Sequence, residues 1–217
     1  MSLIHRLLPQ TVTKAVIFLH GVGANGQDLL GLSSFLQPAL PSTVAYIAPD
    51  GFDPYDMLPV GMVAESYQWF SLKDRSPVVL SAEVDRAAVR FQAFFEEIRS
   101  DLALDYSDIV LVGFSQGTML AITAALQLPS PVAGVVGFSG AFLPPSSVHS
   151  HPAFCLIHGK QDEVIPSYAS QKAAEDLKQR GCLVDCFVDE GLGHSIDERG
   201  IQRMAKYASQ WLNPIAA

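Results

Sequence analysis

Short apolar runs recur along the chain and alternate with segments of helical periodicity. The runs are rich in Val, Ile, Leu and Phe, and most show no alternation between apolar and polar positions. That pattern is typical of strands buried on both faces of a parallel sheet. The predicted strands cover residues 12–19, 43–49, 109–113, 132–138, 153–157 and 183–188.

Between these runs, apolar residues at every third or fourth position predict helices with one buried face. The predicted helices cover residues 81–104, 118–128, 167–180 and 197–212. Strands that alternate with helices predict an α/β fold with a mostly parallel sheet and helices on both faces. The chain shows no internal repeat and no long linker, so we predict one domain over residues 1–217.

Composition narrows the class of protein further. Apolar residues make up 49% of the chain, too many for a disordered one. The net charge of −8 disfavours nucleic acid and anionic lipid surfaces as partners. The sequence has no stretch of 18 apolar residues and no signal peptide at its start, which predicts no integral membrane segment and a cytoplasmic location.

Three cysteines do not make a disulfide framework. Cys182 and Cys186 lie in one predicted strand, where four residues span about 13 Å, beyond the reach of a bridge. Cys155 stands in an apolar run and is predicted to be a small buried side chain.

One candidate for chemistry is the sequence Gly113-Phe114-Ser115-Gln116-Gly117, which matches G-x-S-x-G. It follows a predicted buried strand and opens a predicted helix, the context in which a sharp turn presents a nucleophilic serine. Ser139 also follows a strand but is not followed by a helix, so we predict a structural role for it. The alternative for Ser115 is a Gly/Ser connection without chemistry.

A serine hydroxyl needs a base, and the base needs a carboxylate to orient it. On this fold the order along the chain is serine, acid, histidine. His194 fits as the base, because it follows the last predicted strand. Ser195 and Glu198 after it form a capping-box pattern that predicts the start of the final helix at this point.

The other five histidines fit less well. His5 comes too early in the chain. His20 and His158 each end a strand before a glycine, where a packed, hydrogen-bonded histidine is the simpler interpretation. His149 and His151 lie in a predicted surface loop without a strand directly before them.

For the acid, Asp162 lies in a loop after a predicted strand and before a helix. Glu163 is its nearest rival, and an exposed charged turn is the alternative without function. Asp185 and Asp189 belong to the next strand or its end, and Asp176 belongs to a helix.

The three candidates are spaced in register with the predicted fold. Ser115 and Asp162 are 47 residues apart, and Asp162 and His194 are 32 apart. Acyl transfer also needs two N–H groups for the oxyanion. Gln116 can supply one, and the glycine-containing turn 20–26 can supply the other. A phosphate-binding turn is the alternative for 20–26, although it lacks both the G-x-G-x-x-G and the Walker patterns.

Four segments, HGVGANG, GFSQG, HGKQDEVIP and GLGHS, together resemble the phospholipase/carboxylesterase family, which includes acyl-protein thioesterases. The resemblance covers nearly the whole chain. It implies an α/β-hydrolase without a large cap domain, a triad of Ser115, Asp162 and His194, and an oxyanion hole formed by the N–H groups of Val22 and Gln116.

Segment 50–76 is rich in large apolar side chains without any period, and we predict that it lines an apolar groove beside the serine rather than the core. The resemblance places Trp69 and Phe70 near the substrate. The same segment is a candidate surface for pairing with a second copy of the chain. Its large apolar residues are Phe52, Tyr55, Met57, Leu58, Met62, Tyr67, Trp69, Phe70 and Leu72.

The sequence therefore predicts a serine esterase that cleaves carboxylic esters or thioesters of short to medium acyl chains through an acyl-enzyme. It predicts no metal and no organic cofactor. The substrate would be a small ester, a lysophospholipid or an acylated protein. Two alternatives stay open: a peptidase or amidase on the same fold, and an inactive hydrolase fold that serves as a binding module.

Overall fold

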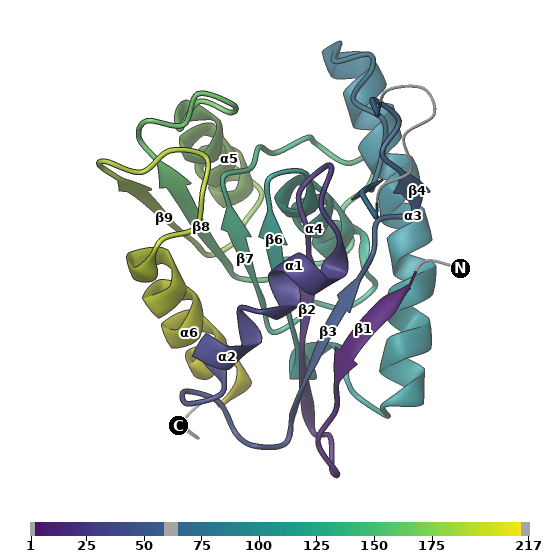
Figure 1. The fold of residues 1–217 in the computed structure, drawn as a ribbon. Coiled ribbons are helices and arrows are strands. Elements are labelled where there is room, and N and C mark those ends of the chain that lie inside the picture. The colour runs from purple at the N-terminus through teal and green to yellow at the C-terminus, as the bar shows by residue number, and fades with distance from the viewer. Residues whose placement is uncertain (1–2, 59–64, 214–217) are drawn as a thin grey trace.

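The computed structural model describes residues 3–58 and 65–213. Its centre is a seven-stranded sheet with the order β1-β3-β2-β6-β7-β8-β9 (Figure 1). Neighbouring strands are parallel except β1, which pairs antiparallel with β3 at one edge. The strands of this sheet are β1 (Ile4–Leu7), β2 (Lys14–Leu19), β3 (Val44–Pro49), β6 (Ile109–Phe114), β7 (Gly134–Phe138), β8 (Phe154–Gly159) and β9 (Val184–Asp189).

Helices cover both faces of the sheet (Figure 1). Helices α1, α2 and α6 pack on one face, and α3, α4 and α5 pack on the other. A small hairpin of β4 (Asp53–Pro54) and β5 (Tyr67–Gln68) stands apart from the main sheet. The helices are α1 (Gly26–Leu30), α2 (Ser33–Leu36), α3 (Pro77–Asp101), α4 (Gln116–Gln127), α5 (Tyr168–Gln179) and α6 (Glu198–Leu212), with one 3-10 turn, η1 (Tyr106–Asp108).

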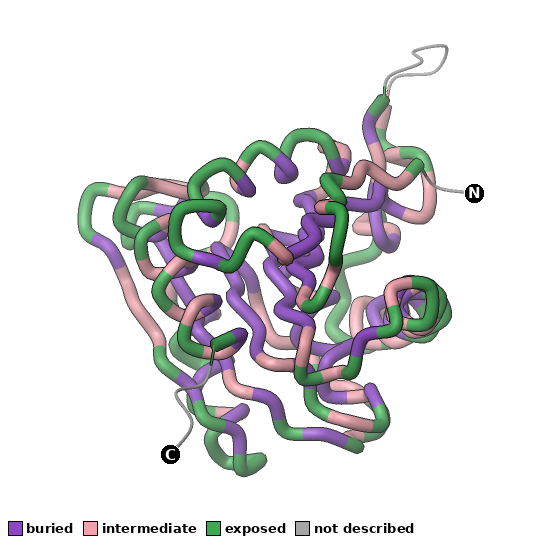
Figure 2. Tube along the Cα trace, turned by 90° about the horizontal axis from the view of Figure 1, so that it is seen from below, coloured by how far each residue is buried: buried purple, intermediate pink, exposed green. Residues whose placement is uncertain are grey.

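The lack of alternation in the central strands follows from this layering. In β2, Ala15 and Ile17 belong to the core under α3 and α4, whereas Val16 and Phe18 belong to the core on the other face. Successive side chains of a strand point to opposite faces, so both faces need apolar residues. Figure 2 shows the central strands buried and the surrounding loops and helix surfaces exposed. The predicted parallel sheet with two covered faces is confirmed.

Helix α3 differs from its prediction at both ends. It begins at Pro77, four residues before the predicted start. Proline is favoured at the first turn of a helix because its missing N–H would be unpaired there anyway. The helix ends at Asp101, before the predicted end at residue 104, because Ala103 adopts a φ of 51° that no helix continues through.

The predicted capping box at Ser195 is wrong. Helix α6 begins at Glu198, and its N-cap is Asp197, whose carboxylate accepts a hydrogen bond of 2.8 Å from the Gly200 N–H. Aspartate caps a helix as well as serine does, so a pattern alone does not decide between Ser195 and Asp197.

The prediction that segment 50–76 stays out of the core is wrong for Trp69 and Phe70. Their exposed fractions are 1% and 3%, and both belong to the apolar core on the α3 side of the sheet. So little exposed area leaves them almost no surface to offer a substrate. Met57, in contrast, is half exposed, and Met62 lies outside the described residues.

The three cysteines are free thiols, as predicted. Burial raises the pKa of the Cys155 thiol to about 12, which makes it a poor nucleophile. Among the helices of the described residues, none combines the length and the apolar character needed to cross a bilayer.

Candidate active site

Ser115 stands in a strained turn between β6 and α4. Its backbone has φ 53° and ψ −114°, a conformation that a non-glycine residue rarely adopts. Two hydrogen bonds hold the turn: the Ser115 N–H donates to the Phe138 carbonyl at 2.9 Å, and the Thr118 N–H donates to the Ser115 carbonyl at 3.0 Å. This is the strand-turn-helix geometry that raises a serine above the end of a sheet.

The two glycines of the G-x-S-x-G pattern are required by close backbone packing. A Cβ at Gly117 would lie 1.9 Å from the carbonyl oxygen of Leu19, the last residue of β2. A Cβ at Gly113 would lie 2.6 Å from the carbonyl oxygen of Gly117. Neither distance is compatible with a side chain, so these positions accept only glycine if the turn is to stay this tight.

Asp162 and His194 are in direct contact. His194 Nδ1 lies 2.7 Å from Asp162 Oδ2, and the Asp162 side chain has an exposed fraction of 0%. The other carboxylate oxygen accepts the N–H groups of Val164 and Ile165 at 2.9 and 2.8 Å. Burial opposes ionisation of this carboxyl, but the bonds from Ile165, His194 and Val164 outweigh it and lower the Asp162 pKa below its usual value.

The loop that carries Asp162 is fastened to the loop that carries His194. The Gln161 N–H donates to the Leu192 carbonyl at 2.9 Å, and the Gly191 N–H donates to the Gln161 side chain at 2.6 Å. At Gly159, the end of β8, a Cβ would lie 2.2 Å from the Leu192 oxygen. These contacts fix the acid and the histidine relative to each other across 32 residues of sequence.

The residue before Ser115 contacts this pair. The ring of Phe114, the residue before it, has its centroid 5.0 Å from that of His194. The His194 side chain has an exposed fraction of 18%, and Ser115 one of 6%, so both are mostly buried but keep some contact with solvent. No hydrogen bond joins Ser115 Oγ to His194 within the described residues, and proton transfer between them stays a prediction.

The turn 20–26 packs directly against the serine. A Cβ at Gly21 would lie 3.0 Å from the Phe114 ring and 3.4 Å from Ser115 Cβ. In the turns and loops of the described residues, the N–H groups of Val22 and Gln116 donate no backbone hydrogen bond. Both are therefore free of competing backbone acceptors at the place where a developing oxyanion needs donors.

Residues 66–69, in β5 and on either side of it, support this turn, a role that the sequence did not reveal. The Gly23 N–H donates to the Tyr67 carbonyl at 2.8 Å, and the Ser66 hydroxyl donates to the Gly23 carbonyl at 2.7 Å. The indole N–H of Trp69 donates to the His20 carbonyl at 2.8 Å. Trp69 thus acts from inside the core on the backbone of the turn.

The side chain of Gln116 joins the serine turn to the same segment. Its amide oxygen accepts the Trp69 N–H at 2.9 Å, and its amide nitrogen donates to the Phe70 carbonyl at 2.7 Å. Gln116 is buried, with both ends of its amide satisfied. No sequence pattern signals this bridge, because its partners are more than 45 residues away.

His20 is a buried, neutral histidine. The Gly51 N–H donates to its Nε2 at 2.7 Å, so the proton sits on Nδ1, which donates to the Gly21 carbonyl at 2.7 Å. Burial lowers the His20 pKa, although the bond to Gly21 and the nearby Asp50 charge oppose that shift. The prediction that His20 is packed and hydrogen-bonded rather than a free base is confirmed.

The remaining rivals lie where the sequence placed them. His149 and His151 are exposed loop residues, and Glu163 is exposed beside the buried Asp162. His5 is hydrogen-bonded to Asp50 at 3.2 Å near the sheet edge. Within the described residues, no three His, Cys, Asp or Glu side chains are grouped closely enough to hold a metal ion.

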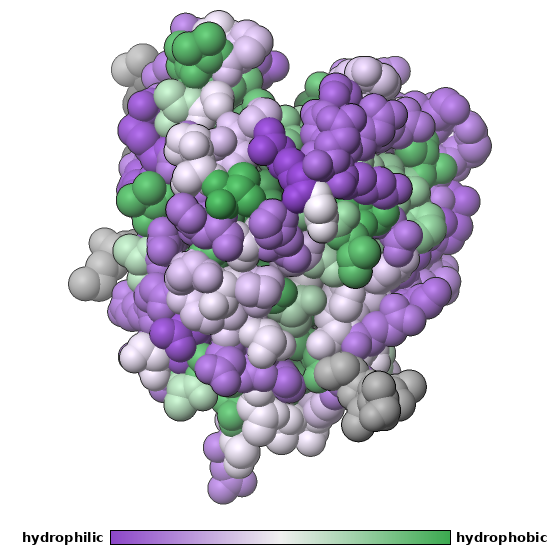
Figure 3. Space-filling view, turned by 180° about the vertical axis from the view of Figure 1, so that it is seen from behind, coloured by the Kyte–Doolittle hydropathy of each residue, from purple (hydrophilic) through white to green (hydrophobic). Residues whose placement is uncertain are grey.

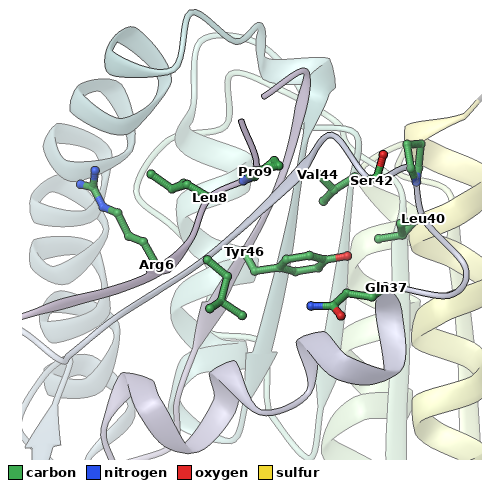
Figure 4. Close-up of a pocket in the computed structure, with 10 residues that line it drawn as sticks. Arg6, Leu8, Pro9, Gln37, Leu40, Ser42, Val44 and Tyr46 are labelled. Carbon is green, nitrogen blue, oxygen red and sulfur yellow. The ribbon is translucent and has the colours of Figure 1, made fainter. Parts of the chain in front are cut away.

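A cavity of about 650 Å³ lies at the opposite edge of the sheet. Figure 4 shows the Tyr46 phenol extending toward Gln37, with Leu40, Ser42 and Val44 around it. Val44 begins β3, so this cavity lies at the amino ends of the parallel strands. Ser115, Asp162 and His194 follow the carboxyl ends, where active sites of open α/β sheets lie.

Comparison with known proteins now identifies the family. The profile of the phospholipase/carboxylesterase family matches residues 9–212. The chain belongs to this family. As a member of it, the protein is a carboxylic ester hydrolase with the α/β-hydrolase fold and no large cap. The family resemblance read from the four sequence motifs is confirmed.

Individual relatives agree with this assignment. Esterase YpfH from Escherichia coli K12 is 27% identical over 188 residues, covering 86% of this chain and 78% of that protein. Acyl-protein thioesterase 1 from Gibberella zeae is 24% identical over 218 residues, covering 93% and 92%. The crystal structure of esterase PE8 superposes with a TM-score of 0.89 at 28% identity, covering 97% of this chain and 99% of that one.

Proposed function

We propose that this family member hydrolyses esters or thioesters of short to medium acyl chains through an acyl-enzyme on Ser115. The observation that carries the proposal is the strained turn at Ser115 beside the hydrogen-bonded Asp162–His194 pair. A nucleophile, a base and an orienting acid on three separate loops have no structural purpose in common, whereas acyl transfer needs all three.

In the first half of the reaction, Ser115 Oγ attacks the acyl carbonyl while His194 Nε2 accepts the hydroxyl proton. Asp162 holds Nδ1–H of His194, so that Nε2 is the free acceptor. The carbonyl oxygen gains negative charge and is bound by the N–H groups of Val22 and Gln116. His194 then donates its proton to the departing alkoxide or thiolate, which leaves an acyl ester on Ser115.

In the second half, water attacks that acyl ester while His194 accepts a proton from it. The carboxylic acid is released and the serine regains its proton from His194. Helix α4 begins at Gln116, whose N–H group is one of the two proposed oxyanion donors. The partial positive charge at this end of the helix therefore favours the negative charge on the carbonyl oxygen in both halves of the reaction. The reaction consumes one water for each acyl group and needs no redox partner.

Two comparisons support the range of leaving groups. One relative is named an esterase and another an acyl-protein thioesterase. Both leaving groups depart more easily than an amine, and the same triad would serve both. We therefore propose thioesters together with oxygen esters, and a small ester, a lysophospholipid or an acylated protein as the natural substrate.

The test uses a panel of p-nitrophenyl esters and acyl thioesters of graded chain length, assayed with the parent and with Ser115→Ala. Ser139→Ala is the matched control, because Ser139 also follows a strand and also has a positive φ, of 47°. We expect Ser115→Ala to lose about 10⁴-fold or more in kcat, and Ser139→Ala to stay near the parent.

A fluorophosphonate probe gives an independent measurement. We expect it to label Ser115 once per chain and to label nothing in Ser115→Ala. Undiminished hydrolysis by Ser115→Ala would reject the proposal. Faster cleavage of an acyl amide than of the matched ester would favour the amidase alternative, and absence of turnover on every substrate would favour the binding module.

A further inference from the structure

Asp162 has a second imidazole on the oxygen that binds His194. His158 Nε2 lies 3.1 Å from Asp162 Oδ2, the atom that accepts His194 Nδ1 at 2.7 Å. The His158 side chain is fully buried, with an exposed fraction of 0%. The reaction proposed above gives His158 no role, and as the last residue but one of β8 it is not on the loop of the base.

The contacts of His158 fix which ring nitrogen carries the proton. Nε2 faces two acceptors, Asp162 Oδ2 and the Ile165 carbonyl at 2.9 Å, so it must be the donor. Nδ1 lies 2.7 Å from the hydroxyl of Ser170, whose single proton has two acceptors within reach, Nδ1 and the Gly140 carbonyl at 3.2 Å. In a neutral ring with its proton on Nε2, Nδ1 accepts the Ser170 proton along the shorter of these two contacts.

The β9 and α5 residues next to this ring are uncharged. In the register of the sheet, β9 places the uncharged Val188 beside His158. Helix α5 contributes Ser170 to it. Asp189, the next residue of β9, is engaged by the Arg203 guanidinium. Among the described residues, Asp162 is the charged side chain that contacts His158.

We infer that His158 is a positioning residue for the hydrolysis, which shares the Asp162 carboxylate with His194 and limits how strongly that carboxylate holds protonated His194. The inference rests on the proposed function, in which His194 shuttles the proton. The Nε2–H group of His158, which donates to the Ile165 carbonyl, also lies 3.1 Å from the carboxylate oxygen that binds His194, so its positive end lowers the negative potential at that oxygen and favours one rotation of the carboxylate. Ser170 in turn fixes the ring of His158.

Electrostatics predicts in which direction the loss of His158 shifts the pH dependence of kcat/KM. Without the His158 donor, the carboxylate keeps more of its charge for His194 and stabilises the imidazolium. Protonated His194 cannot accept the serine proton. The acid limb of the kcat/KM profile should move to higher pH, and kcat should fall because the carboxylate is less well fixed.

The experiment compares His158→Leu, which removes the donor, with His158→Gln, whose amide nitrogen can still donate to Asp162. Ser170→Ala removes only the support behind the ring, and Ser115→Ala reports on the proposed function itself. Each variant is assayed from pH 5 to 9 for kcat and KM on one short-chain ester. Thermal unfolding and the low-field proton resonance of the His194–Asp162 hydrogen bond are recorded without substrate.

We expect His158→Leu to lower kcat about tenfold or more while KM changes less than about twofold. Its acid limb should shift upward by about half a pH unit, and the low-field resonance should move. His158→Gln should recover most of kcat, and Ser170→Ala should fall between the two. The Gln and Ala variants keep the test valid even if His158→Leu does not fold.

Two results would overturn the inference. One is a parent-like pH profile and kcat in folded His158→Leu. The other is a loss in His158→Gln as large as that in His158→Leu, with unfolding temperature falling and the pH profile unchanged, which would make the role purely structural. Undiminished hydrolysis by Ser115→Ala would instead reject the proposed function, so the two failures are distinguishable.

Discussion

Buried polar side chains hold the turn that faces Ser115. His20, Gln116 and Trp69 each make a hydrogen bond to backbone on the other side of the site, at 2.7 to 2.9 Å. An oxyanion hole of backbone N–H groups works only if those groups are fixed before charge develops. These three residues supply that rigidity from within the core, where water does not compete for their partners.

The role of Asp162 predicts a large effect of a small change. Asp162→Asn keeps the shape of the side chain but presents an amide N–H to His194 in place of an acceptor. His194 would then carry its proton on Nε2 and could not accept the proton of Ser115. We expect kcat to fall about 10³- to 10⁴-fold, measured on the ester panel.

Glu163→Gln is the matched control for that change, since Glu163 is the neighbouring carboxylate and is exposed. It should keep parent-like turnover. Equal losses in both variants would mean that the negative charge of this turn matters rather than the contact with His194. A loss of turnover in Glu163→Gln alone would assign to Glu163 the role of the carboxylate that orients His194.

The neutral His20 predicts a dependence of stability on pH. Its pKa is lowered in the folded chain, so the unfolded state binds a proton more readily as pH falls through about 6.5. The stabilisation from His20 is therefore fully present above that pH. It is lost as pH falls from there toward the lower pKa that His20 has in the folded chain. Through this one group, the free energy of unfolding changes by at most about 1.4 kcal/mol per pH unit.

Replacement by glutamine tests this sign. The amide oxygen of His20→Gln can still accept the Gly51 N–H, but the side chain no longer titrates. Urea unfolding at pH 5.5, 6.5 and 7.5 should give a free energy of unfolding that changes less with pH in the variant than in the parent. An equal dependence in both would show that other groups carry the proton linkage.

Among the elements, the start of α6 decides where the loop of His194 ends. The Asp197 carboxylate accepts the Gly200 N–H, and its pKa is lowered because this bond and the Arg199 contact outweigh the effect of burial. The cap, Asp197, is the third residue after His194. A stable cap therefore limits the freedom of the loop as well as that of the helix.

We expect Asp197→Ala to lower the free energy of unfolding by about 1 kcal/mol. Ser195→Ala should leave it unchanged, because Ser195 is exposed and does not cap the helix. Urea unfolding at neutral pH measures both. A larger loss in Ser195→Ala would restore the capping box that its sequence pattern suggested.

Strong local patterns explain which elements could be predicted. Strands such as β6 and β8 are buried on both faces, so their sequences are continuously apolar and their extents were close to correct. The elements β1, α1, α2, β4 and β5 were missed because each has only two to five residues. Such short elements depend on tertiary partners rather than on local periodicity.

The candidate site divides in the same way. Ser115, Asp162 and His194 could be proposed because loop order and motifs are local or follow from the topology. The bridge from Gln116 to Trp69 joins residues 47 apart and leaves no local pattern. Trp69 and Phe70 were placed at a groove because apolar residues without a period look the same in a groove and in a core.

The whole molecule carries a net charge of −8. On the face seen in Figure 3, hydrophilic side chains are spread over the surface with apolar groups scattered among them. A net negative charge repels anions over long distances. At 0.1 M salt this repulsion is largely screened beyond about 10 Å. This property belongs to the chain as a whole and not to the three residues of the candidate triad.

Salt should therefore separate two substrates that share one acyl group. For an ester with an anionic leaving group, kcat/KM should rise from 10 mM to 300 mM salt, because screening removes the repulsion on approach. For the matched neutral ester it should stay constant, which also controls for salt effects on the enzyme itself. A fall in kcat/KM for the anionic ester would show that cationic side chains near Ser115 outweigh the net charge of the molecule. Lys160, whose amine contacts Glu190 beside the loop of His194, would then be the first cation to replace.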